Sequence, residues 1–313
     1  MRHRIVLLLL WLMVVSGTFV SAQTIIDLNS GGSVRSKTQE DYVRETIGLQ
    51  ERLKADSLAY VDRLTRAFNA LYRDSLHEAE RLLNDALRLR PQAPANFIVR
   101  HYLGKIDMAR GQFKPAVEKF TQLLKERPLD REIRLDRATC YFELGSIRPA
   151  LQDCDVLLKG EQRDELRIRA LFLRSAVYRK NRQSDLARND LNEILQLDAT
   201  NTSALLLIPL CLEEMGQPQE ALNQLNLFVT SHPERVDGWV ARAELEIRLG
   251  MTAAARADYD QALRLSPDDA NLYVSRATLL LDMNVKAAAK KDLEKAVQLG
   301  IERHLLAALF NRL

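Results

Sequence analysis

The sequence predicts an all-α fold, a solenoid of about seven helix-turn-helix repeats, from three observations. The chain repeats its pattern with a period of 34 residues, which is typical of stacked helical units that cannot bury their apolar faces alone. Its 313 residues include only 12 Gly and 9 Pro and are 47% hydrophobic, which suits helices packed around an extended core. One alanine also recurs seven times along the chain, as Ala79, Ala116, Ala150, Ala187, Ala221, Ala255 and Ala289.

The stretch from Val236 to Asp269 shows the pattern most clearly. It carries Trp239 in a first helix, Gly250 at the turn, Ala255 in a second helix and Pro267 at the end of that helix. A small residue such as Ala255 lets the two helices approach closely, and Pro267 stops the second one. On these residues the chain resembles the tetratricopeptide repeat family. The resemblance implies two antiparallel helices per unit, stacked in a right-handed α-solenoid.

The repeats are expected to cover residues 60–303. They run as 60–93, 97–130, 131–164, 168–201, 202–235, 236–269 and 270–303. Three-residue insertions at 94–96 and 165–167 interrupt the strict period, and both are expected to lie at joints between repeats. The Leu-rich residues 304–313 are expected to form a C-terminal capping helix over the last repeat.

The N-terminal region is expected to be an export signal followed by a linker. Residues 1–22 have a basic start, a short apolar run from Ile5 to Val15 and small residues before Gln23, as signal peptides do. Residues 23–37 are expected to form a flexible leader, and residues 38–58 an N-terminal capping helix. These features predict an exported chain, periplasmic or secreted, with no stable membrane insertion after cleavage.

Charge and motif content argue against several classes of function. The signal peptide holds two of the 45 basic residues, Arg2 and Arg4, so 45 − 2 = 43 basic residues remain against 42 acidic ones. This balance predicts no nucleic-acid partner. No motif of a metal centre, a phosphate-binding loop or a nucleophile elbow occurs, so no cofactor, metal or catalytic residue is expected and the chain is interpreted as a non-enzyme.

Four arginines and four aspartates recur together at a separation of sixteen residues. They are Arg137 and Asp153, Arg174 and Asp190, Arg242 and Asp258, and Arg276 and Asp292. Two repeats that lack the arginine, with Leu103 or Ile208 in its place, also lack the aspartate. Repeat 60–93 is the exception, because it has Arg66 but Leu82 in place of the aspartate. This joint presence and absence predicts structural ion pairs between the two helices of a repeat. They are expected to be partly exposed pairs that contribute about 1 kcal/mol or less each.

The three cysteines occupy positions that are apolar in the other repeats. Cys140 and Cys211 stand where other repeats have Ile106 or Leu245, which favours buried free thiols. A bridge between Cys140 and Cys154 stays open as an alternative, because opposing helices could bring these two side chains within reach.

The family resemblance implies a binding groove along the first helices. On the family's geometry, apolar side chains in the middle of the chain should line it, with charged residues at its rims. The apolar set is Phe172, Leu173, Leu206, Leu207, Leu210 and Val240. The charged set is Arg179, Lys180, Glu213, Glu214 and Glu244. Alternatively, neighbouring first helices cover most of these apolar side chains, since apolar helical faces are usually core.

The expected function is a non-enzymatic protein-protein interaction scaffold that binds a peptide or protein partner in this groove. The alternative is a structural or oligomerisation component of a cell-envelope assembly, with possible self-association. The clamp with which some family members hold a C-terminal carboxylate is not supported. The corresponding positions hold His101, Lys105, Asp136, Arg169 and Leu173, with no Asn.

Overall fold

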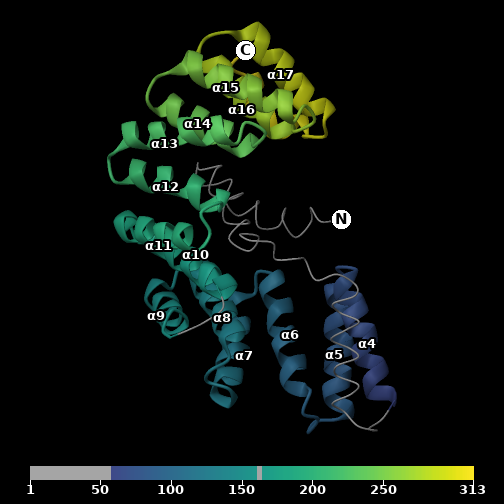
Figure 1. The fold of residues 1–313 in the computed structure, drawn as a ribbon. Coiled ribbons are helices and arrows are strands. Elements are labelled where there is room, and N and C mark those ends of the chain that lie inside the picture. Colours follow the sequence, from purple (N-terminus) through teal and green to yellow (C-terminus); the bar gives the residue numbers. More distant parts are fainter. Residues whose placement is uncertain (1–57, 161–163) are drawn as a thin grey trace. The chain divides into compact units, whose positions relative to one another are not determined.

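The computed structural model of the chain describes residues 58–160 and 164–313. These residues form consecutive, packed helix pairs and contain no strand, so the predicted all-α fold of repeated helix pairs is confirmed (Figure 1). The predicted signal peptide (1–22), the leader (23–37) and nearly all of the N-terminal capping helix (38–58) lie outside the described residues.

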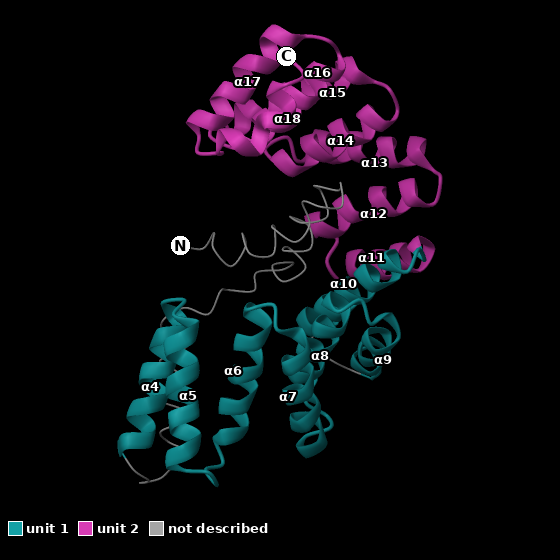
Figure 2. Cartoon of the chain, turned by 180° about the vertical axis from the view of Figure 1, so that it is seen from behind, with its two compact units in different colours: residues 1–9, 25–183 teal, residues 10–24, 184–313 magenta. Residues whose placement is uncertain are grey.

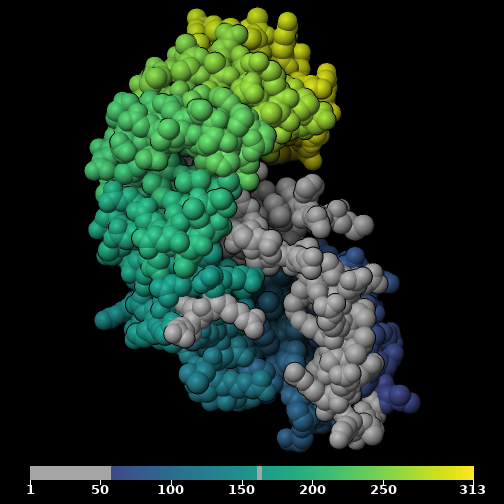
Figure 3. Space-filling view, in the orientation of Figure 1, coloured from purple at the N-terminus to yellow at the C-terminus, as the bar shows by residue number. Residues whose placement is uncertain are grey.

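The chain divides into two compact units, and the division falls after Gln183 (Figure 2). Within the described residues the first unit contains α4 to α10, and Figure 3 draws the atoms of the chain in the orientation of Figure 1. The bounds are Leu58–Tyr72 for α4, Leu76–Leu89 for α5, Asn96–Ala109 for α6, Phe113–Glu126 for α7, Arg131–Glu143 for α8, Ile147–Leu157 for α9 and Asp164–Lys180 for α10.

The second unit contains α11 to α18. The bounds are Ser184–Leu197 for α11, Thr202–Glu214 for α12, Pro218–Ser231 for α13, Val236–Arg248 for α14, Thr252–Leu265 for α15, Ala270–Asp282 for α16, Lys286–Gln298 for α17, Arg303–Leu306 for the 3-10 helix η1 and Ala307–Phe310 for α18. At the end of the chain Leu306 is buried, and Phe310 packs in the same cluster as α16 and α17. Residues 303–310 therefore contribute to the core of the last repeat.

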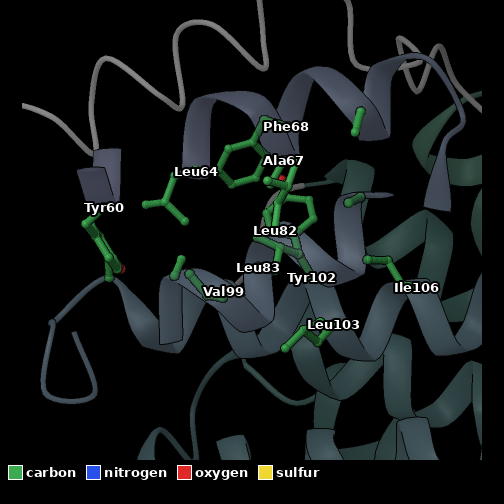
Figure 4. Close-up of a cluster of buried hydrophobic side chains, with 14 of the residues drawn as sticks. Tyr60, Leu64, Ala67, Phe68, Leu82, Leu83, Val99, Tyr102, Leu103 and Ile106 are labelled. Carbon is green, nitrogen blue, oxygen red and sulfur yellow. The ribbon is translucent and has the colours of Figure 1, made fainter. Parts of the chain in front are cut away.

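The core of the first unit begins between α4, α5 and α6 (Figure 4). Phe68 meets Tyr102 edge-on, with ring centroids 4.9 Å apart. The Tyr60 hydroxyl donates to Asn96 Oδ1 at 2.9 Å, and burial raises the pKa of Tyr60 to about 12. Asn96 Nδ2 in turn donates to the carbonyl oxygen of Arg90 at 2.7 Å, so the first insertion joins α5 to α6 through a buried polar side chain.

The second insertion does not lie at a joint. Residues 165–167 belong to the first turns of α10, which begins at Asp164. Two acidic residues, Asp164 and Glu165, stand in that first turn, where carboxylates interact favourably with the exposed amide groups of a helix N-terminus.

The turn between the two helices of a repeat has one backbone conformation throughout. The predicted turn glycines all have a positive φ, from +70° at Gly145 to +77° at Gly216. The repeats without a glycine there use Asp74, Arg182 and Asn284, each with a φ of 59°. The left-handed residue that ends the first helix is thus kept in all seven repeats, although its identity is not.

Candidate interaction surfaces on the first helices

The predicted apolar strip in the middle of the chain is wrong for four of its six residues. Phe172, Leu173, Leu206 and Leu207 are all buried, with at most 7% of their surface exposed. Leu206 lies in a cluster with Leu225 and Phe228 of α13 and Leu245 of α14. The all-round apolar character of α12 is therefore a packing requirement, because α11, α13 and α14 surround it within the second unit.

Leu210 and Val240 are the two members of the strip that remain half-exposed. Val240 belongs to a row of side chains on one side of α14, spaced three or four residues apart. We call this row the α14 face and define it as Val240, Glu244, Ile247 and Arg248, none of which is buried. On the other side of the helix, residues such as Ala241 and Leu245 are fully packed.

The charged rim residues of the second unit are held in a small network. Arg248 binds Glu213 with both arms of its guanidinium, Nη2 to Oε2 at 2.7 Å and Nε to Oε1. This pair links the C-terminal ends of α12 and α14. Glu214 accepts a hydrogen bond of 2.5 Å from the hydroxyl of Ser184.

Glu244 differs from these rim residues, because it forms no ion pair with any described residue. Partial burial and the nearby Glu213 raise the pKa of Glu244 to about 7, although Arg248 acts in the opposite direction. Burial and the charge of Glu244 together raise the pKa of Tyr259, whose hydroxyl is hydrogen-bonded to Ser275 of α16. Glu244 thus stands in the middle of the α14 face as a carboxyl group without a cation of its own.

The first helices of the first unit carry a different polar cluster, centred on the buried Asp136 of α8. Its Oδ2 lies 2.7 Å from His101 Nε2 and 3.9 Å from Lys105 Nζ, both on α6. Burial alone would raise the pKa of Asp136, but Lys105, His101 and Arg169 outweigh it and hold that pKa below its usual range. These groups satisfy one another, so the cluster ties α6 to α8.

Lys180, predicted at the groove rim, is exposed at the end of α10, and its amine contacts α8. Lys180 Nζ donates to the carbonyl oxygen of Phe142 at 2.9 Å and lies 4.7 Å from the centre of the Phe142 ring. Arg179 beside it is half-buried. Both side chains belong to the first unit, whereas Leu210, Val240, Glu213, Glu214 and Glu244 belong to the second.

Three of the four recurring arginines are bound to the aspartate sixteen residues further on. Nε and Nη2 of the arginine each donate to one carboxylate oxygen in Arg137–Asp153, Arg242–Asp258 and Arg276–Asp292, at 2.7 to 2.8 Å. The aspartates are buried, with 4–5% of their surface exposed, whereas 16–21% of each arginine side chain is exposed, so the pairs are partly exposed only at the arginine. Arg174 and Asp190 belong to different units, and their pairing stays a prediction.

Each of the four arginines also contacts the preceding repeat, which the sequence did not predict. The Nη1 atom of each arginine donates a hydrogen bond of 2.6 to 3.2 Å to a polar side chain of that repeat. The pairs are Arg137–Thr121, Arg174–Asp155, Arg242–Asn226 and Arg276–Asp260. These acceptors occupy one repeated position in the second helices. The sequence signal was a polar residue 16 residues before three of the arginines and 19 residues before Arg174, and it was missed because the residue type changes from repeat to repeat.

One of the two repeats without the arginine, repeat 97–130, has a different ion pair. Lys119 stands at the aspartate position of repeat 97–130, and its amine binds Asp107 of α6. The charges are exchanged relative to the other repeats, since the cation now lies on the second helix.

The three cysteines are buried free thiols, and the alternative of a Cys140–Cys154 bridge is wrong. Cys140 packs against Phe97 and Phe120, whereas Cys154 lies in a separate cluster with Leu135. Burial raises the pKa of the Cys140 thiol, which keeps it protonated and unreactive.

No group of three or more His, Cys, Asp or Glu side chains is arranged to hold a metal ion within residues 58–160 and 164–313. Over the same ranges, none of the helices is long and apolar enough to cross a bilayer.

Sequence comparisons connect the chain to known repeat proteins. A profile of the tetratricopeptide repeat family matches residues 102–165 and 212–270. Human tetratricopeptide repeat protein 16 is 26% identical over 230 residues, which cover 70% of this chain and 23% of that protein. The chain spans about a fifth to a quarter of the length of the curated relatives it matches.

Structural comparisons agree with the sequence matches. The crystal structure of a tetratricopeptide repeat protein from Parabacteroides merdae is similar with a TM-score of 0.66 and 26% identity, over 82% of this chain and 99% of that one. PilF from Pseudomonas aeruginosa has a TM-score of 0.53 and 16% identity, over 70% and 94% of the two chains. At that identity the second likeness concerns the fold alone.

Proposed function

This chain is a tetratricopeptide repeat protein, and we propose that it acts as an exported, non-enzymatic scaffold that binds a peptide or protein segment along its first helices. The repeat fold generally mediates protein–protein interactions and is typically a scaffold without catalytic activity. The coarse function therefore follows from the family. The surface, the partner and the location are the proposal.

The observation that carries the proposal is the composition of the α14 face. Val240 and Ile247 pack on one side against the core and stay half-exposed on the other, whereas Ala241, Ala243 and Leu245 of the same helix are buried. Glu244 lies between them in the row and forms no ion pair with a described residue, because Arg248 is already bound to Glu213. This face is complementary to a partner segment with apolar side chains that contact Val240 and Ile247. The same segment would place a Lys or Arg beside Glu244, so that polarity and charge both match.

A peptide-display selection tests this surface. Short random peptides are selected on the full chain, and the enriched sequences are measured for binding to the wild type and to Glu244→Lys. The proposal expects enriched peptides with a basic residue among apolar ones, and a loss of affinity of about tenfold or more in the variant. Glu234→Lys is the matched control, because Glu234 is exposed in the turn before α14 and outside the face.

Two results would reject the proposal. Peptides that bind Glu244→Lys as well as the wild type would remove the α14 face from the site. A stable oligomer in light scattering, whose formation blocks all peptide binding, would favour the alternative of an assembly component.

Export is tested separately on the native protein. N-terminal sequencing should find Gln23 as the first residue, since residues 1–22 have the features of a signal peptide. A mature chain that still contains Arg2 would contradict export by cleavage at this site.

A further inference from the structure

Glu246 of α14 is a buried carboxyl group that the repeat does not neutralise. Only 5% of its surface is exposed, and its Oε2 has no hydrogen-bond partner among the described residues. Its Oε1 lies 3.9 Å from Arg242 Nε, which is too far for a hydrogen bond. Polar atoms in this situation usually have a partner, so the exception requires an explanation.

The equivalent positions of the other repeats show what is missing. The repeats on either side have Leu212 and Leu280 there, both buried. Repeat 97–130 has the carboxylate Asp107, which is also buried but is bound by Lys119 from the second helix. In repeat 236–269 the position of that lysine is occupied by Asp258, so Glu246 faces a second carboxylate where Asp107 faces a cation.

The charges around Glu246 do not balance when it is ionised. Arg242 on α14 and Asp258 on α15 are the charged groups that act on it, and they are already bound to each other through two hydrogen bonds of 2.7 Å. The Nη1 atom of Arg242 is engaged by the uncharged Asn226 of α13. An ionised Glu246 would add a second negative charge beside one guanidinium, inside the packed repeat.

We propose that repeat 236–269 is a proton-stabilised element, in which Glu246 is held as a neutral carboxylic acid and its ionisation loosens the packing of α14 on α15. Burial and, next, the charge of Asp258 raise the pKa of Glu246 to about 7, and Arg242 offsets this only in part. Because the pKa is higher in the folded repeat than in the unfolded chain, protonation stabilises the fold at low pH. That stabilisation is lost as the pH rises through about 7.

This property would act on the surface proposed for binding, since α14 carries both. Val240 and Glu244 project from the helix whose inner side contains Glu246. Ordering of that helix would therefore follow the pH of the compartment. The proton-stabilised element itself does not depend on whether the α14 face binds a partner.

Hydrogen exchange of the full chain, read by mass spectrometry on peptides from residues 236–265, tests the proposal without any ligand. The exchange rate of these peptides, corrected for intrinsic exchange, reports how often the fold opens. For each carboxyl with a raised pKa, this rate should increase by up to roughly tenfold per pH unit between about pH 5 and 7 and level off above about pH 8. Glu246→Leu should remove one such contribution, because leucine fills the equivalent positions at Leu212 and Leu280. The difference between wild type and variant separates Glu246 from Glu244, whose pKa is also raised.

Two further variants make the result decisive. Glu246→Gln keeps the shape and removes the charge, and it replaces the leucine variant if that variant fails to fold. Glu234→Gln, at an exposed position, should keep the wild-type pH dependence. The proposal is overturned if the leucine and glutamine variants both retain the wild-type pH dependence, or if the Glu246 carboxyl titrates near pH 4.5, the usual value for a glutamate, in the folded chain.

Discussion

Three of the recurring arginines contact two repeats through a single guanidinium group; they are Arg137, Arg242 and Arg276. Nε and Nη2 hold the buried aspartate of the same repeat, and Nη1 reaches a polar side chain on the second helix of the repeat before. The planar fork of arginine suits this double role, which a lysine amine could not fill with the same geometry. These side chains therefore act as fixed links between neighbouring helix pairs.

Removing one such link should lower the free energy of unfolding. Arg276→Leu leaves Asp292 buried without its cation and also frees Asp260, so we expect a loss of about 3–5 kcal/mol in the free energy of unfolding, measured by urea titration. Arg264→Leu, an exposed position on α15, should change it by about 0.5 kcal/mol or less. Equal effects of the two variants would mean that the link contributes nothing specific.

Asp136 should make the first unit sensitive to acid. Its pKa is lowered in the fold, so its contribution to stability is present above its usual value of 3.8 and is lost as the pH falls through the lowered value. Asp136→Asn should weaken the pairing of α6 with α8 at neutral pH and flatten the acid dependence of hydrogen exchange in residues 96–143. Unchanged acid dependence in the variant would assign that dependence to other carboxylates.

At the scale of the helix pair, close approach and turn geometry decide where the helices lie. The backbone of α6 passes so near α7 that a Cβ on Gly104 would lie 2.5 Å from Phe120 Cε1. The turn after each first helix needs one left-handed residue, whether it is a glycine or, at Arg182, a side chain that tolerates this conformation poorly.

Gly104→Ala should therefore destabilise the first unit. An added methyl must displace the fully buried Phe120, and overpacking of this kind costs about 1–3 kcal/mol in the free energy of unfolding. Adding Phe120→Leu to Gly104→Ala should recover part of that loss. If Phe120→Leu instead lowers the stability of Gly104→Ala further, by the full cost of the cavity that the smaller side chain leaves, the close contact is not the cause of the loss.

The turns allow a prediction of opposite sign. Arg182→Gly removes a left-handed side-chain residue and should leave the melting temperature unchanged or raise it, whereas Gly145→Ala should cost about 1–2 kcal/mol. Calorimetry of both variants checks the pair. A large destabilisation by Arg182→Gly would show that the arginine side chain, and not the backbone, fixes this turn.

For the whole molecule, the sequence contained the repeat architecture but not all of the packing inside it. The 34-residue period and the recurring alanine predicted the helix pairs, because these residues are read directly from their spacing. Leu206 and Leu207 were assigned to a binding surface and are core, since an apolar first helix has the same sequence whether a partner or a neighbouring helix covers it.

The candidate site was accessible from the sequence only in part. Val240 is predicted in the groove and Glu244 at its rim, and both are half-exposed residues of α14. The environment of Glu246 could not be predicted from spacing alone. It depends on which carboxylate and which guanidinium meet in the core, and only the packed structure shows that Arg242 is already engaged by Asp258.

Site-specific photo-crosslinking in the native cell tests the central claim, that the α14 face binds a partner, most directly. A photoreactive phenylalanine derivative replaces Val240 on this face and, as the control, Ala257 on the exposed side of α15. We expect the probe at Val240 to crosslink to a chain other than this protein, and the crosslink to disappear when Glu244→Lys is added. Crosslinks of equal strength from Ala257, or crosslinks from Val240 only to a second copy of the chain, would contradict the proposed role of the α14 face.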